Sequence, residues 1–205
     1  MPPSSQTSIT TSIDDRMIAA MRLVLAASAL LITYMDPLEP SRLVAVTYAA
    51  LLLYTAYSGV LYALALRRTS FIPAEITHWV DVGWYVALIG LSSGTNSMFF
   101  YFFFFSILVA SFQWGLASGL RVTLASAVFF TSIGLATAPV AAEFELNRFL
   151  LRPIYLLALG YMTAYWGGSE IALKRRLTLL KDVSRLSNPR FGVDRTLGMI
   201  VEQLR

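Results

Sequence analysis

Six long apolar segments, separated by short polar ones, dominate this 205-residue sequence. They cover approximately residues 17–35, 42–66, 74–91, 98–114, 120–138 and 149–166. About 20 mostly apolar residues are enough for a helix to cross the roughly 30 Å hydrocarbon core of a bilayer. The composition agrees, because 57% of the residues are hydrophobic and 14% are charged, against about 45–50% and about 25% in soluble domains. The sequence therefore predicts an all-α, polytopic membrane bundle of six transmembrane helices.

The basic residues predict how this bundle is oriented. One side of the six segments carries Arg16, Arg22, Arg67, Arg68, Arg121, Lys174, Arg175, Arg176, Lys181 and Arg185. The loops on the other side carry Arg42, Arg148 and Arg152 beside Asp36, Glu39, Glu143 and Glu145. Cytoplasmic loops are enriched in Lys and Arg, so both termini are expected in the cytoplasm. The outer loops are short, so a stimulus has to be read in the bilayer, at its surface or from inside the cell.

Changes in composition divide the chain into four parts. Residues 1–15 are rich in Ser, Thr and Pro and lack the basic start of a secretory signal, so they are expected to form a disordered cytoplasmic N-terminus. Residues 16–168 form the predicted transmembrane domain, and residues 169–186 a juxtamembrane helix continuous with the sixth span. Residues 187–205 begin a new amphipathic pattern that stops before it is complete, which predicts a cytosolic domain continuing beyond Arg205.

The juxtamembrane helix carries Leu173, Leu177 and Leu180 at spacings of four and three residues. This spacing suits the seam of a parallel two-helix coiled coil, which predicts a homodimer. The same helix is basic, so the alternative is that it lies on the anionic lipid of the membrane surface.

Four ionisable residues lie within the predicted spans: Arg22, Glu75, His78 and Asp81. Each charge at a helix centre costs about 2.5–3.5 kcal/mol on insertion scales and needs a compensating contact. Arg22 and Asp81 lie roughly 8 and 10 Å from the cytoplasmic start of their spans, so Arg22 is expected to pair with Asp81 or Glu75. The pair either holds two helices together or belongs to a titratable, ligand-binding cluster with His78. One His and two carboxylates on one helix make a poor transition-metal set, so no metal site is predicted.

Small residues mark predicted helix contacts. Gly160, Ala164 and Gly168 recur every four residues on the sixth span, and Gly115 and Gly119 form a GxxxG motif at the start of the fifth. The stripe on the sixth span is interpreted either as the dimer axis or as a surface packed against the first or second span.

Residues 179–205, LLKDVSRLSNPRFGVDRTLGMIVEQLR, resemble a junction in bacterial six-span sensor histidine kinases, where the membrane region passes into a GAF-like domain. The resemblance implies an inner-membrane homodimer that signals to a response regulator. It also implies an ATP-dependent kinase whose phosphoacceptor and ATP-binding motifs lie beyond Arg205. No catalytic motif is predicted within the segment itself, and no nucleic-acid partner.

Gly94, Thr95, Asn96 and Phe99 resemble the Gly-Gly-Thr-x-Asn-Pro-Phe element of quinone-sensing redox kinases, with Ser93 in place of the first glycine and without the proline. The resemblance implies quinone as a ligand, and the aromatic side chains of Trp79, Trp84 and Tyr85 are its expected companions. The alternative is a polar turn between two helices, with the aromatic run of residues 99–105 serving only for packing.

The function predicted from these features is a transmembrane sensory input module. A transporter or channel is the main alternative. Such proteins typically have broken spans with polar residues near the midplane and a repeat between their halves, and this sequence shows no clear repeat. A membrane enzyme needs a protease or transferase motif, and the sequence shows neither.

Overall fold

The computed structural model describes residues 6–35, 43–67, 73–92, 94, 97–137 and 146–186. The helices are α1 (Gln6–Met35), α2 (Val44–Leu66), α3 (Ala74–Leu91), the short 3₁₀ helix η2 (Met98–Tyr101), α4 (Phe102–Trp114), α5 (Leu116–Thr137) and α6 (Leu146–Leu186). The predicted all-α class is confirmed. Residues 1–5 of the predicted N-terminus and the predicted cytosolic start at 187–205 lie outside the described residues.

Three segments are long and apolar enough to cross a membrane, namely Asp15–Met35, Val44–Leu66 and Leu116–Thr137. The segment Met98–Trp114 is apolar but shorter. In α3 the hydropathy is lowered by Glu75, His78 and Asp81. The chain is therefore a helical membrane protein, and its three longest apolar helices carry that conclusion.

Two helices begin at least four residues before their predicted starts. α1 begins at Gln6, so the helix includes residues 6–15, which were predicted to be disordered. Extending an existing helix adds one hydrogen bond for each residue fixed, which favours continuation of the helix beyond its apolar part. α5 begins at Leu116 rather than near residue 120, because Gly115 ends α4 at φ 85° and the next helix starts at once.

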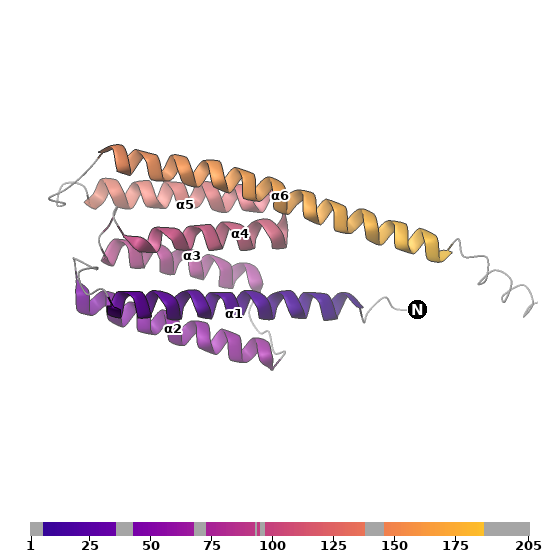
Figure 1. Cartoon of the computed structure of the whole chain (residues 1–205), viewed down its shortest axis with the longest axis horizontal. Coiled ribbons are helices and arrows are strands. Elements are labelled where there is room, and N and C mark those ends of the chain that lie inside the picture. Colours follow the sequence, from indigo (N-terminus) through magenta and orange to yellow (C-terminus); the bar gives the residue numbers. More distant parts are fainter. Residues whose placement is uncertain are drawn as a thin grey trace, which may run out of the picture.

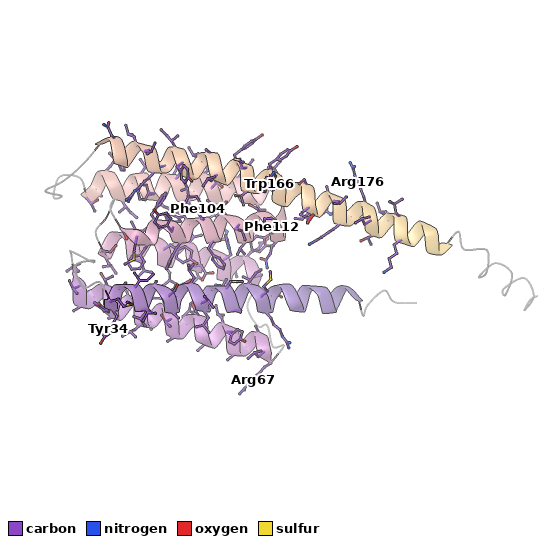
Figure 2. The ribbon with its side chains drawn as sticks, in the orientation of Figure 1. Tyr34, Arg67, Phe104, Phe112, Trp166 and Arg176 are labelled. Atoms are coloured by element: carbon purple, nitrogen blue, oxygen red, sulfur yellow. The ribbon has the colours of Figure 1, made fainter. Side chains whose placement is uncertain are left out.

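The helices lie side by side along the bundle, and successive helices run in opposite directions (Figure 1). α1 packs closely on α2, and α4, α5 and α6 pack closely on one another. α3 lies between these two groups and contacts both less extensively. The start of α1 and the end of α6 are at the same end of the bundle (Figure 1). Arg67 and Arg176 lie toward this end and Tyr34 at the other (Figure 2).

The aromatic run at residues 99–105 supplies much of the core. Phe99, Phe100, Phe102 and Phe103 are buried, whereas Tyr101 is exposed. The Phe100 ring lies 4.9 Å from the ring of Phe130 on α5, at the distance of a favourable aromatic pair. Most of this run therefore joins η2 and α4 to the neighbouring helices, which supports its interpretation as packing.

α6 is one unbroken helix of 41 residues. Its membrane part contacts α4 and α5, with Leu156 and Ala164 fully buried. Beyond Gly168 it leaves the bundle, and the residues from Ala172 to Lys181 are exposed. The structure therefore shows the predicted continuity between the last bundle helix and the juxtamembrane helix.

Candidate functional site

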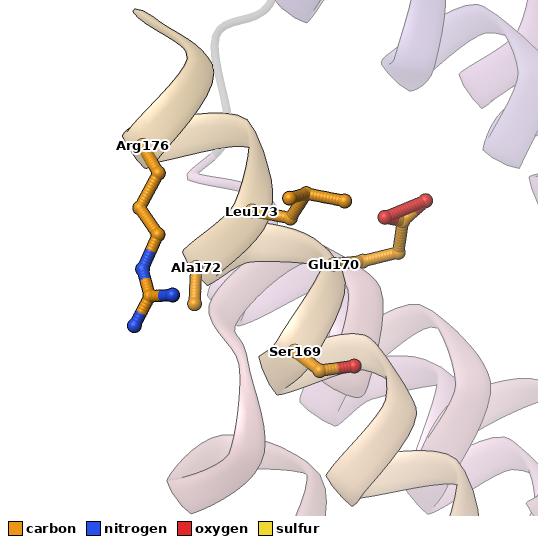
Figure 3. A pocket seen from close by; sticks show the side chains of 5 residues that line it. All are labelled: Ser169, Glu170, Ala172, Leu173 and Arg176. Atoms are coloured by element: carbon orange, nitrogen blue, oxygen red, sulfur yellow. The ribbon is translucent and has the colours of Figure 1, made fainter. Parts of the chain in front are cut away.

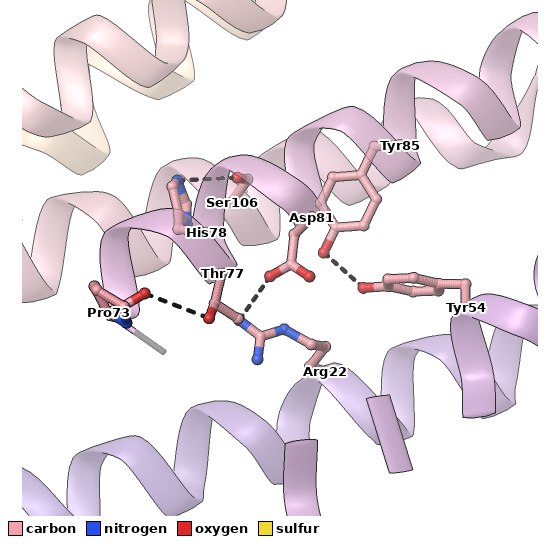
Figure 4. A network of polar contacts seen from close by, with 8 residues as sticks. All are labelled: Arg22, Tyr54, Pro73, Thr77, His78, Asp81, Tyr85 and Ser106. Atoms are coloured by element: carbon pink, nitrogen blue, oxygen red, sulfur yellow. Dashed lines mark hydrogen bonds and ion pairs between the residues drawn. The ribbon is translucent and has the colours of Figure 1, made fainter. Parts of the chain in front are cut away.

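α3 carries a row of three buried polar side chains, each of which contacts a different helix. His78, Asp81 and Tyr85 follow one another at spacings of three and four residues, so they lie on one side of α3. All three are almost fully buried. His78 contacts α4, Asp81 contacts α1 and Tyr85 contacts α2 (Figure 4). Polar contacts therefore attach α3 to both parts of the bundle.

Arg22 of α1 and Asp81 of α3 form a buried ion pair. Arg22 Nη2 lies 2.6 Å from Asp81 Oδ2, and the two side chains are 7% and 2% exposed. The predicted pairing is confirmed, with Asp81 rather than Glu75 as the partner, since Glu75 is exposed in the first turn of α3. Arg22 Nε and Asp81 Oδ1 find no hydrogen-bond partner within the described part of the chain. The pair is therefore incompletely satisfied within these residues, and each buried polar atom without a partner costs free energy.

Tyr54 of α2 and Tyr85 of α3 form a second buried contact one turn further along. Their hydroxyl oxygens lie 3.0 Å apart, and the rings meet edge to face with centroids 5.8 Å apart. Both side chains are fully buried. Tyr54 was not predicted, because a single tyrosine within an apolar span does not show whether it faces lipid or a neighbouring helix. The available signal was its spacing of seven and four residues from the polar Thr47 and Ser58, which places all three on one side of α2.

His78 makes the third contact of α3. Its Nε2 lies 3.3 Å from Ser106 Oγ on α4, and its ring meets the Trp114 ring edge to face at 5.3 Å. His78 turns toward Ser106, whereas Asp81 turns toward Arg22 (Figure 4). A spacing of three residues separates two side chains by about 60° around a helix, which is enough to place them in different interfaces. The predicted cluster of four is thus divided into the Arg22–Asp81 pair, the separate His78 contact and the exposed Glu75.

The residues predicted for a quinone pocket are spread along α3 and the following turn. Trp79 is 47% exposed, whereas Tyr85 and Phe99 are buried in the core. Trp84 is half-buried and packs on Tyr54, and Thr95 and Asn96 lie outside the described residues. Trp79 lies about 18 Å of helix from the end of α3, and Gly94 lies beyond that end. Trp79 and Gly94 therefore do not belong to one pocket of quinone size.

The structure describes three residues between α3 and η2, namely Ser92, Gly94 and Ser97, and their contacts are typical of a turn. Gly94 has φ 61°, a conformation that favours glycine. Ser97 caps η2, because its Oγ accepts a hydrogen bond from the backbone N–H of Phe99 at 3.2 Å. Ser92 Oγ lies 2.6 Å from Ser97 Oγ, and both serines are buried. This geometry favours the interpretation of the segment as a polar turn.

The small-residue stripe of α6, made of Gly160, Ala164 and Gly168, faces α5 within the same chain. A Cβ added at Gly160 would lie 2.3 Å from Thr123 Cγ2, and one at Gly168 would lie 3.0 Å from Leu116 Cβ. Ala164 is fully buried and lies close to Gly119. The stripe therefore packs on α5 and not, as one of the two interpretations predicted, on α1 or α2. Because Ala164 is fully buried in this contact, the stripe does not support the other interpretation, a dimer axis.

The leucine side chains of the juxtamembrane part of α6 are exposed. Leu173, Leu177 and Leu180 are 54%, 57% and 65% exposed, and in the described part of the chain no other helix covers them.

Within the same described ranges, no three His, Asp or Glu side chains come close enough to hold a metal ion.

Together, the fold and the site define a helical membrane bundle. Buried polar contacts attach α3 to its neighbours, and α6 continues beyond the bundle as a long exit helix. Comparisons with protein-family models, with curated proteins and with solved structures found no match.

The Tyr54–Tyr85 contact is expected to stabilise the bundle by a coupling of about 0.6–1.5 kcal/mol. Tyr85→Phe should destabilise the chain, because it leaves the buried Tyr54 hydroxyl without its partner. Adding Tyr54→Phe should then cost little more, since the second hydroxyl is already unpaired. Unfolding of the two single variants and the double variant in detergent measures this coupling. Strictly additive losses would show that the two hydroxyls do not interact.

Proposed function

We propose that this chain is the transmembrane input module of a bacterial two-component sensor histidine kinase. In this proposal all six helices cross the inner membrane and both ends lie in the cytoplasm. Alternating helix directions support it, as do the basic residues Arg67 and Arg176 toward the end where α1 begins (Figure 2). α3 and α6 are less apolar than the three longest apolar spans. The charge of Asp81 is paired with Arg22, however, and the polar ring of His78 is covered by α4.

The observation that carries the proposal is the continuity of α6. One helix extends from the fully buried Ala164 to the exposed leucines at 173, 177 and 180. A continuous helix transmits rotation, tilt or translation along its length, whereas a loop would absorb it. α6 is therefore suited to carry a change of packing in the membrane to a cytosolic kinase part.

The contacts of α3 suggest how a stimulus reaches α6. α3 is bonded to α1 and α2 through Asp81 and Tyr85, and to α4 through His78. α4 in turn packs along α6. A stimulus that alters one polar contact of α3 moves α4 relative to α6, in the manner of small helix shifts at packed interfaces. The coupling needs two states with different contacts, and the incompletely satisfied ion pair is the contact expected to differ between them.

Disulfide crosslinking tests the dimer that this proposal requires. The chain contains no cysteine, so a single introduced thiol reports only its own position. Leu173→Cys, Leu177→Cys and Leu180→Cys in membrane vesicles should crosslink efficiently, because these positions share one side of α6. Thr178→Cys lies about 100° or more around the helix from each of them and serves as the matched control.

Crosslinking at the three leucine positions should exceed that at Thr178 several-fold. Equal yields at all four positions would contradict a defined dimer seam along α6, and so would the absence of crosslinking at the leucines.

A further inference from the structure

α6 forms a groove with the α4–α5 turn at the point where it leaves the bundle. The groove is lined by Trp114, Gly115, Leu116, Tyr165, Ser169 and Arg175, among others. It lies at one end of the apolar helix α5, which begins at Leu116, and therefore at the level of the membrane surface in a bundle that spans the bilayer.

The packing around two glycines fixes the walls of this groove. Gly168 brings α6 against α5, since a Cβ at Gly168 would lie 3.0 Å from Leu116 Cβ. At Gly115 an added Cβ would lie 3.5 Å from Ile171 Cδ1, in ordinary contact. Two helices and a tight turn therefore hold the groove, which gives it a defined shape.

The side chains of the groove combine aromatic surface with one positive charge. Trp114 and Tyr165 provide the aromatic walls, and such residues concentrate at membrane surfaces, where an apolar ring meets polar headgroups. Arg175 is the charged residue of the lining, and no carboxylate accompanies it among the lining residues. Lys174 and Arg176 add positive charge on either side of it in the sequence. An anion with an apolar tail matches this combination.

We propose that this groove binds one anionic phospholipid. Its phosphate lies within reach of the Arg175 guanidinium, and its acyl chain runs along Trp114 and Tyr165. Arginine suits this role, because its planar group donates two parallel hydrogen bonds to phosphate oxygens. The bound lipid would lie between α6 and the α4–α5 turn and so would bias the direction in which α6 leaves the bundle. The proposal requires a membrane-embedded bundle but not a kinase downstream.

A second groove on α6 provides an internal control. It is lined by Ser169, Glu170, Ala172, Leu173 and Arg176, all of which belong to α6 itself (Figure 3). It has no wall from α4 or α5, and the carboxylate of Glu170 opposes the binding of phosphate. Arg176 is adjacent to Arg175 in the sequence and is likewise exposed. Arg176→Gln therefore removes the same charge without touching the proposed lipid site.

Quenching of Trp114 fluorescence by brominated lipids tests the proposal. The full chain, with its other three tryptophans replaced by phenylalanine, is placed in phosphatidylcholine nanodiscs. Brominated phosphatidylglycerol or brominated phosphatidylcholine is then added in increasing amounts. We expect phosphatidylglycerol to quench Trp114 at about fivefold lower mole fraction, the factor that corresponds to about 1 kcal/mol per basic residue at an anionic surface. Arg175→Gln should abolish this preference, whereas Arg175→Lys and Arg176→Gln should retain most of it.

Three results would overturn the proposal: equal quenching by the two lipids, equal loss of preference in Arg175→Gln and Arg176→Gln, or removal of the preference by soluble inorganic phosphate. The second would indicate general surface charge, and the third a site for a free anion. An unchanged Trp114 emission spectrum in pure phosphatidylcholine shows that each variant keeps its fold. Crosslinking at Leu177 is measured separately, so failure of the lipid site is distinguishable from failure of the proposed dimer.

Discussion

Asp81→Asn is expected to lower the free energy of unfolding by about 3–5 kcal/mol, the usual cost of removing one partner from a buried ion pair. The asparagine side chain has nearly the same size as the aspartate, so the loss does not come from a cavity. It comes from the Arg22 guanidinium, which is 7% exposed and would keep its charge without a counter-charge. Unfolding by SDS titration in mixed micelles, followed by circular dichroism, measures the change.

Two further variants show whether the uncompensated charge is the cause. Arg22→Met combined with Asp81→Leu removes both charges and replaces them with apolar side chains of similar length, so it should recover most of the lost stability. Glu75→Gln alters an exposed carboxylate on the same helix and should change stability by less than about 0.5 kcal/mol. If the double variant is as unstable as Asp81→Asn, the packing at this site matters more than the charge.

The same substitution separates the two interpretations of the ion pair. In a contact that only holds α1 and α3 together, Asp81→Asn lowers stability and leaves the crosslinking pattern of α6 unchanged while the chain remains folded. In a sensory contact, the variant also changes the crosslinking yield at Leu177→Cys under those conditions, because the shift of α3 passes through α4 to α6. Measuring stability in mixed micelles and crosslinking in vesicles for the same variant distinguishes these outcomes.

The sequence was sufficient to predict the ion pair because the prediction depended only on depth. Arg22 and Asp81 lie at similar distances from the predicted starts of their apolar spans, at residues 17 and 74, and the two helices run in the same direction. A buried charge needs an opposite one at its own depth. The contact of His78 with Ser106 depended on something else, the rotation of α3 about its axis. A rotation of 60° decides between α1 and α4 as the partner, and the spacing of the polar residues along α3 does not determine it.

The small residues of α6 illustrate a second limit. Their four-residue spacing correctly indicates a close helix contact, but the choice of partner depends on the order of the helices around the bundle. That order follows from the packing of all the helices together, and nothing in the local sequence near Gly160 or Ala164 specifies α5. The same limit applies to Gly167, which lies outside the four-residue stripe and yet brings α6 close to the backbone of α4.

Gly167→Ala is the second substitution with a large expected effect. A Cβ at Gly167 would lie 2.5 Å from the backbone oxygen of Ser111 and 2.6 Å from its carbonyl carbon. These atoms belong to the backbone of α4 near its end, so they cannot move aside as a flexible side chain would. α6 has to move away from α4, and overpacking of this kind costs about 1–3 kcal/mol.

Gly83→Ala on α3 is the matched control, because nothing lies within 4 Å of the Cβ that it adds. It should leave stability unchanged or raise it by up to about 1 kcal/mol, the gain in helix propensity from glycine to alanine. The two variants add the same methyl group to two helices of one bundle, so the difference between their unfolding free energies isolates the contact of α6 with α4. If Gly167→Ala is as stable as Gly83→Ala, α6 is not in close contact with α4 at the point where it leaves the membrane. The proposed route from α3 through α4 into the exit helix would then be absent at this point.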